Sequence, residues 1–225
     1  MLVGTTFAAA PSYAQQSLSF SFGAFTPHGE DARIRSGRGS GDVLVNNLDS
    51  LAFRIKDFNG ATFNADYLIG MGEWLDAGLG VGFYRRTVPT VYLDLVNQDG
   101  SEIEQDLRLR IVPWTATIRF LPLGRSSAVQ PYIGAGVGIF QWRYSETGQF
   151  VATDSTIFRD SFVGSGAKAG HVILGGVRFG AGPFSIGGEV KYQKAEGDLP
   201  LDQEFSANKI DLGGWTYAAT VSVKF

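Results

Sequence analysis

The sequence predicts an all-β fold: an eight-stranded antiparallel up-and-down barrel that spans a membrane, with short turns at one end and long loops at the other. The segment 215–225 alternates between apolar odd positions and mostly polar even positions, as one strand between lipid and a barrel interior does. Its length suits a tilted membrane strand, and aromatic residues lie at both of its ends. The chain also has 30 glycines, which suit the crowded inner wall of a narrow barrel.

Composition excludes several classes of function. The chain has no cysteine, so thiol chemistry and disulfides are excluded. Its net charge is -3 and it contains no long run of lysine or arginine, which argues against nucleic-acid binding. The glycines of 134–138 repeat at every second residue and no helix-forming segment follows them, so they indicate the inner wall of a strand rather than a nucleotide-binding loop. We therefore expect no cofactor.

Residues 1–14 are predicted to be the remnant of a signal peptide, and residues 15–225 to form one barrel domain. The apolar start ends in Ser12-Tyr13-Ala14, a small-x-small cleavage pattern. The first basic residue is Arg33, however, so the usual positive amino-terminal region is missing. An ordinary apolar tail is the alternative.

The first three strands are expected at 18–25, 62–69 and from 75 toward 97, because apolar residues alternate through each of them. Asp99-Gly100 supplies the hairpin turn after the third strand. Between the first two strands, residues 26–57 are rich in Gly, Asp, Asn and Arg and predict a long loop. Four apolar residues recur in it at helical spacing: Leu44, Leu48, Leu51 and Ile55. They predict either a short amphipathic helix at the barrel mouth or an extension of a strand.

The fourth strand, which ends at Phe120, changes its pattern in the middle. Apolar residues occupy odd positions up to Ile111 and even positions from Trp114, so a β-bulge is predicted at Val112-Pro113. The remaining segments are assigned in order: strand 132–144, loop 145–168, strand 171–179, strand 184–192, loop 194–213 and the closing strand 215–225. Short and long connections thus alternate, and the even strand count places both chain ends on the periplasmic side.

The chain resembles the small eight-stranded outer-membrane β-barrel proteins of Gram-negative bacteria, the broad class that includes the OmpA membrane domain, OmpX and OmpW. The resemblance rests on the alternating strands, on the glycine-rich 132–138 and on the terminal Phe225. It implies a location in the bacterial outer membrane and recognition of the closing strand by the barrel-insertion machinery. The residues implied in that recognition are Trp215, Tyr217, Val221, Val223 and Phe225.

A polar network is predicted inside the barrel. If the strands are assigned correctly, seven charged residues face the interior: Asp66, Asp76, Arg119, Arg178, Glu189, Lys191 and Lys224. The interior of an eight-stranded barrel is just wide enough for side chains, so these groups are expected to pair and to close the lumen.

The favoured function is therefore structural or interactive: a monomeric anchor that presents its outer loops to lipid, lipopolysaccharide or another surface partner. Residues of both charges decorate the hairpin between the third and fourth strands, where they would contact phosphates of lipopolysaccharide or another surface partner, or form ion pairs on a solvated hairpin. They are Arg85, Arg86, Glu102, Glu104, Asp106, Arg108 and Arg110. One alternative is a narrow channel or transporter for small molecules, including hydrophobic ones. A second is a lipid-A-modifying enzyme using His171. No enzyme is expected, because no Ser-Asn or Ser-Asp signature accompanies this histidine. His28 and His171 are also too few and too far apart in sequence to suggest a metal site.

Overall fold

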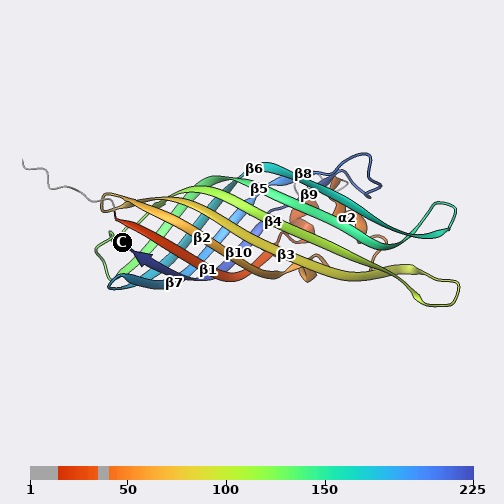
Figure 1. Cartoon of the computed structure of the whole chain (residues 1–225), viewed down its shortest axis with the longest axis horizontal. Coiled ribbons are helices and arrows are strands. Elements are labelled where there is room, and N and C mark those ends of the chain that lie inside the picture. The colour runs from red at the N-terminus through yellow and green to blue at the C-terminus, as the bar shows by residue number, and fades with distance from the viewer. Residues whose placement is uncertain (1–14, 35–40) are drawn as a thin grey trace, which may run out of the picture.

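The computed structural model describes residues 15–34 and 41–225, so the predicted signal-peptide remnant lies outside the described residues. Eight antiparallel strands form a closed barrel in the order β1-β10-β7-β6-β5-β4-β3-β2 (Figure 1). The barrel strands are β1 (Gln16–Pro27), β2 (Gly60–Met71), β3 (Leu75–Val96), β4 (Glu102–Phe120), β5 (Val129–Val151), β6 (Ile157–Ala181), β7 (Phe184–Lys194) and β10 (Gly214–Lys224). The predicted fold class is confirmed.

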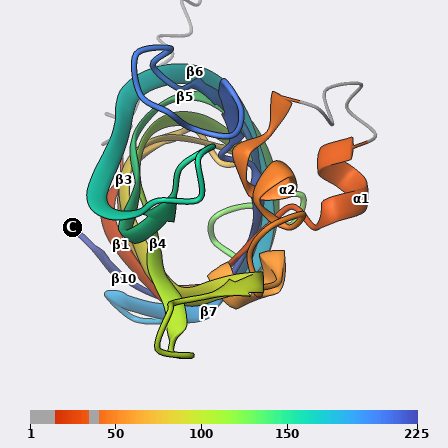
Figure 2. The ribbon, with the colours of Figure 1, turned by 90° about the vertical axis from the view of Figure 1, so that its right-hand side faces the viewer.

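Short elements fill two of the connections at the end of the barrel opposite the short turns. They are helix α1 (Glu30–Arg33), helix α2 (Val43–Asn47), the 3-10 helix η3 (Ile55–Phe58), and the paired strands β8 (Glu196–Asp198) and β9 (Lys209–Asp211). Seen along the barrel, α1 and α2 lie on the same side of the ring of strands (Figure 2). No helix within residues 15–34 and 41–225 has the length and apolar character needed to span a membrane.

The barrel closes where β1 meets β10. Ser19 lies opposite Ser222, and their hydroxyl groups are 2.9 Å apart. At the end of this pair the backbone N–H of Phe225 donates to the carbonyl oxygen of Gln16 at 2.9 Å. The C-terminus therefore lies beside the start of β1, at the end of the barrel that has short turns.

Side chains alternate across the barrel wall as the sequence predicts. Apolar residues such as Leu79 and Ile133 are exposed on the outside, while Ser17, Thr117 and other polar residues are buried inside. Glycines allow the inner wall to pack closely: a Cβ atom at Gly80 would lie 2.2 Å from Oδ1 of Asp66. The apolar exterior is the surface that a membrane-spanning barrel presents to lipid.

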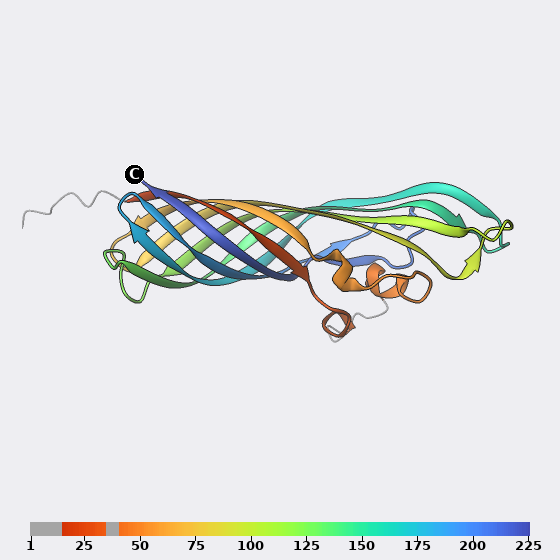
Figure 3. The same cartoon turned by 90° about the horizontal axis from the view of Figure 1, so that it is seen from below.

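Four of the strands continue well beyond the others. Pairing of β2 with β3 stops at Thr62–Tyr84 and pairing of β6 with β7 stops at His171–Lys194. By contrast, β3 pairs with β4 up to Val96–Glu102, and β5 with β6 up to Val151–Ile157. The result is a four-stranded sheet, β3-β4-β5-β6, that projects beyond the closed part of the barrel, whose exterior is apolar (Figure 3).

Two sequence predictions about this sheet are wrong. Residues 145–168, expected to be a loop, belong mostly to β5 and β6, and the sixth strand is much longer than 171–179. The polar composition of this segment, with its glycine and serine residues, is typical of a loop. Aromatic packing stabilises the hairpin that β5 and β6 form here. The ring of Phe150 stacks on that of Phe158 and meets that of Phe162 edge-on, with centroid distances of 5.8 and 4.6 Å.

The predicted β-bulge at Val112-Pro113 is also wrong. The register between β3 and β4 has the same offset at Val81–Trp114 and at Tyr84–Ile111, so no residue is inserted. The hydrophobic pattern changes position because the surroundings change: below this point the barrel interior is polar and lipid lies outside, whereas above it the interior is apolar and water lies outside. Leu109 and Ile111 accordingly point inward and are buried.

A hydrophobic core fills the inner side of the projecting sheet. Two segments cover it, residues 41–58 and 195–213, which we call the mouth cap. The cap contributes residues that are all buried: Val43, Leu44, Leu51, Phe53, Ile55, Phe58, Ala195, Leu199, Ile210 and Leu212. Of the two alternatives for the four spaced apolar residues, the short helix at the barrel mouth is found over Val43–Asn47, which includes Leu44 and ends just before Leu48. Leu51 instead forms an isolated bridge with Tyr92, and Ile55 begins the separate 3-10 helix η3.

Candidate functional site

The lumen holds two groups of charged side chains at membrane depth. In the first, Arg119 lies between two carboxylates: its Nη2 is 3.5 Å from Oδ1 of Asp66, and its Nη1 is 3.4 Å from Oε2 of Glu189. Lys191 lies 3.6 Å from the other carboxylate oxygen of Glu189, and the hydroxyl of Tyr132 donates to Glu189 at 3.0 Å. These side chains come from β2, β4, β5 and β7, so the group links opposite walls of the barrel.

The second group lies near the short turns. Arg178 donates to Oδ2 of Asp76 at 2.8 Å, and Arg125 forms a hydrogen bond to the other oxygen of the same carboxylate. The ring of Tyr132 joins the two groups, because the guanidinium carbons of Arg178 and Arg119 lie 4.8 and 5.4 Å from its centroid. A cavity lined by Asn64, Asp66, Lys191 and Gln193 has a volume of about 10 Å³, room for no more than about one water molecule.

The structure thus places the seven predicted lumen residues inside the barrel. Six are buried within the two groups; Lys224 is partly exposed at the turn end and forms no ion pair with the described residues. Sequence reasoning missed Tyr132 and Arg125. Tyr132 was predictable, because it shares the inward parity of the glycines that follow it. Arg125 was not predictable. It lies in a turn, where side chains do not alternate regularly, so the sequence pattern does not indicate that its side chain points back into the barrel.

A polar cluster fastens the two halves of the mouth cap to each other. The buried guanidinium of Arg33 donates to both oxygens of Asp42, at 2.9 and 2.7 Å. The same carboxylate accepts hydrogen bonds from the backbone N–H groups of Leu44, at the start of α2, and of Asp211, in β9. One carboxylate therefore joins the segment after β1 to the segment before β10.

His28 belongs to this cluster. Its Nδ1 lies 2.8 Å from Oδ2 of Asp211. Burial raises the pKa of Asp211, but the hydrogen bond with His28 and the positive charge of Arg33 outweigh burial, so the pKa lies below its ordinary value. His171 lies elsewhere, exposed on the outer face of β6, and the described residues contain no cluster of His, Asp and Glu that could hold a metal ion.

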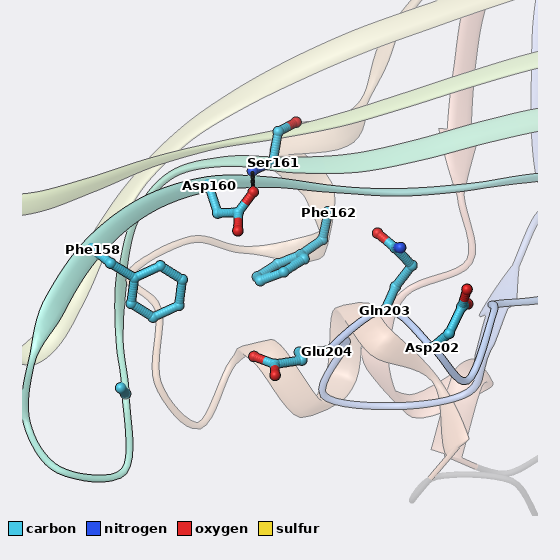
Figure 4. A pocket seen from close by; sticks show the side chains of 8 residues that line it. Phe158, Asp160, Ser161, Phe162, Asp202, Gln203 and Glu204 are labelled. Carbon is cyan, nitrogen blue, oxygen red and sulfur yellow. Dashed lines mark hydrogen bonds between the residues drawn. The ribbon is translucent and has the colours of Figure 1, made fainter.

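A cleft of about 590 Å³ opens between the distal half of β6 and the turn at 202–204 (Figure 4). Its aromatic side chains are Phe158 and Phe162, and its carboxylates are Asp160, Asp202 and Glu204. The ring of Phe162 packs edge-on against Phe205 of the mouth cap, with the two ring centroids 6.4 Å apart. The three carboxylates are exposed and form no ion pair with any described residue.

The cleft lies along an open sheet edge. From residue 157 to 163, β6 pairs with β5 on one side, and among the described residues no strand pairs with its other side. Nearer the barrel, residues of β8 lie beside β6, where Lys168 forms an ion pair with Asp198. The side chain of Gln203 approaches this edge, where its Oε1 accepts from the backbone N–H of Val163 at 3.4 Å. An open edge of this kind offers backbone donors and acceptors to an added strand.

The residues of the predicted assembly signal lie on the outside of β10 and at its end. Trp215, Tyr217 and Val221 are between 44% and 51% exposed, Val223 is partly buried, and Phe225 is 68% exposed. Their recognition by the insertion machinery stays a prediction.

Comparison with solved structures identifies the fold. The chain is similar to the outer membrane protein OprG from Pseudomonas aeruginosa, with 15% identity, coverage of 94% of this chain and 96% of that chain, and a TM-score of 0.53. It is also similar to Neisserial surface protein A, with 12% identity, coverage of 94% and 97%, and a TM-score of 0.48. A third match is Ail of Yersinia pestis, with 15% identity, coverage of 94% and 99%, and a TM-score of 0.45.

No protein-family model matches the chain, and no curated protein matches it. The likeness to OprG, together with the closed barrel and its apolar exterior, defines the fold class: a small eight-stranded barrel of the kind found in bacterial outer-membrane proteins.

Proposed function

We propose that the protein is a closed membrane anchor that displays a folded four-stranded sheet on the cell surface, and that the cleft beside β6 binds a partner. The observation that carries this proposal is the projecting sheet with its own capped hydrophobic core. A loop that only connects two membrane strands needs no such core. The core holds the cleft in a fixed shape, which lowers the entropic cost of binding.

The lumen supports the same proposal because two successive barriers fill it. Charged groups around Arg119 cross the barrel at membrane depth, and apolar residues of the mouth cap fill the space above them. A polar solute would have to cross the apolar layer, and a hydrophobic one would have to cross the charged layer. We therefore propose neither a channel nor a transporter, and we assign no catalytic residues.

The chemistry of the cleft favours one kind of partner. Its carboxylates favour basic side chains, its phenylalanines favour apolar ones, and the open edge of β6 favours an extended backbone. Phe158, Asp160 and Phe162 lie two residues apart on β6 and therefore point to the same side of the sheet (Figure 4). An extended segment that carries basic and apolar residues in turn at every second position would meet all three features, because those side chains also point to one side.

Fluorescent peptides test the cleft directly. A peptide whose every second residue is in turn lysine and phenylalanine, with serine at the positions between, should bind the purified protein, and the same peptide with glutamate in place of lysine should not. The double variant Asp202→Asn/Glu204→Gln should weaken binding of the basic peptide by about tenfold. The matched control is Asp99→Asn/Asp154→Asn, which alters carboxylates in the two distal turns. Equal binding of both peptides, or unchanged binding by the cleft variant, would refute the proposed site.

Surface display has its own test, because the chain has no cysteine. A single cysteine at Gln98, in the distal β3–β4 turn, should react in intact cells with a maleimide that does not cross membranes. A cysteine at Glu73, in a short turn at the opposite end, should react only after the cells are opened. The reverse labelling pattern would overturn the proposed orientation.

A further inference from the structure

Three arginines form a row on the outer face of the barrel. Arg85 on β3 lies directly opposite Arg110 on β4, and Arg110 lies directly opposite Arg143 on β5. All three side chains are exposed. On each of these strands the arginine is the first charged outward residue beyond the apolar belt.

This arrangement is unfavourable for the protein alone. Directly opposed residues of an antiparallel pair have Cβ atoms about 4.5–5.5 Å apart, and like charges in such positions repel. Among the described residues none of the three arginines forms an ion pair. The nearest acidic residue on the outward face of β4 is Asp106, two outward positions farther from the membrane, or about 13 Å along the strand. A bound anion would relieve this repulsion.

The row lies at the level where the membrane surface begins. The next outward residues toward the membrane are Phe83, Val112 and the polar Gln141, and the next after these are Val81, Trp114 and Ile139. Trp114 is 51% exposed, as expected of a tryptophan near a membrane interface. Two residues of a strand span about 6–7 Å, so the guanidinium groups lie within reach of lipid headgroups.

An apolar hollow lies below the arginines on the same exterior face. It has a volume of about 750 Å³ and is lined mainly by outward-facing side chains of β2 to β5. Its lining includes the small residues Ala65 and Ala116 and the larger apolar residues Tyr67, Leu79 and Trp114. A hollow with apolar walls and no charged lining residue suits a hydrocarbon chain.

We propose that this face binds a phosphorylated, acylated glycolipid of the outer leaflet, with its phosphates on Arg85, Arg110 and Arg143 and one acyl chain in the hollow. Arginine suits this role because its planar guanidinium can donate two parallel hydrogen bonds to a phosphate. A phosphate bound between neighbouring guanidinium groups would offset the repulsion. This face is separate from the cleft beside β6, so the two proposals fail independently.

Native mass spectrometry of the full-length protein, released from phosphatidylcholine nanodiscs that contain bisphosphorylated lipid A, tests the proposal. Wild-type protein should retain lipid A. Replacing Arg85, Arg110 and Arg143 by glutamine should reduce retention by about fivefold for each arginine removed. The matched control Arg159→Gln changes an exposed arginine of β6 far above the membrane and should leave retention unchanged.

Changing the lipid tests the phosphate contacts, and changing the hollow tests the acyl contact. Lipid A without phosphates should be lost from the wild-type protein, and Ala116→Phe, which fills the hollow, should reduce retention while all three arginines remain. Unchanged retention by the triple glutamine variant, or retention of phosphate-free lipid A, would overturn the proposal. So would equal retention of phosphatidylglycerol at matched charge, because the partner would then be any anionic lipid.

Should the triple variant fail to fold, salt provides the test on wild-type protein. Retention should fall as ionic strength rises, since exposed charge pairs are screened. Retention that does not change with salt would contradict the arginine contacts.

Discussion

At the scale of single residues, Asp42 organises the outer mouth. Its carboxylate accepts from Arg33 and from backbone groups of two segments that lie far apart in the chain. Nothing in the sequence distinguishes Asp42 from its exposed neighbours Asp31 and Asp49, because its importance comes from contacts with residues far along the chain. The neighbouring apolar spacing, by contrast, predicted either a short helix or a strand extension, and the helix is the one found over Val43–Asn47.

Asp42→Asn should loosen the mouth cap. The substitution removes the negative charge that faces the buried guanidinium of Arg33, and breaking a buried ion pair typically costs about 3–5 kcal/mol. Hydrogen exchange of the amides of Leu44 and Val45 should therefore become much faster. Asp49→Asn, at an exposed position, is the control and should exchange like the wild type. Unchanged exchange in the Asp42 variant would contradict this role.

Glu146 should make the mouth cap sensitive to pH. Burial raises its pKa above the ordinary 4.5, although Asn47 and Tyr144 donate hydrogen bonds to its carboxylate. Because the folded-state pKa is raised, the stabilising contribution is complete below about pH 4.5 and is lost as the pH rises through the folded-state value.

Proteolysis of the mouth cap at several pH values measures this dependence. Relative to the wild type, Glu146→Gln should resist cleavage better at neutral pH, and the two proteins should converge in acid. If the wild type is instead more resistant at neutral pH, the sign of the linkage is wrong.

At the scale of elements, β4 shows how far a repeating pattern can be interpreted. The strand was predictable from alternation over 107–120, although β4 begins earlier, at Glu102. The cause of the change in apolar positions at Val112-Pro113 was not predictable. Alternation shows which face of a strand is apolar, but it does not show which face points into the barrel. Only the three-dimensional arrangement shows that Leu107, Leu109 and Ile111 face a protein core while Trp114 and Ile118 face lipid.

Leu109→Ala should destabilise the projecting sheet and leave the membrane part intact. Leu109 is fully buried, and truncating a buried leucine costs about 2–5 kcal/mol. The expected result is earlier loss of the mouth cap on heating, followed by protease sensitivity of residues 41–58. Leu93→Ala, at a position that is 52% exposed, should cost little. Equal effects of the two substitutions would argue against a folded core.

The closing strand carries a separate prediction. Deletion of Phe225 should lower the amount of protein in the outer membrane, because the terminal aromatic residue is the expected recognition element. Phe184→Ala, which removes an exposed aromatic residue beside Val223, controls for lost lipid contact. Normal membrane levels after the deletion would count against the assembly signal, and they can be measured by immunoblotting of membrane fractions.

At the scale of the whole molecule, the protein combines a membrane barrel with a folded surface structure. The barrel was predictable, since dyad alternation, glycine content and turn residues all pointed to it. The surface structure was not, because its core is assembled from residues 41–58, 195–213 and the distal strand halves, and no single segment shows the pattern. The candidate cleft was not predictable for the same reason. Phe162 and Glu204 are far apart in the sequence, and the fold brings them together by packing the mouth cap beside β6.

The central claim is that the two barriers inside the barrel close it. The function of the protein then lies in the projecting sheet, whose cleft binds a partner. Single-channel recording of the purified, refolded protein in a planar bilayer tests this claim most directly. We expect no steady unitary conductance above that of the bare bilayer. Sustained and reproducible conductance steps would contradict the account.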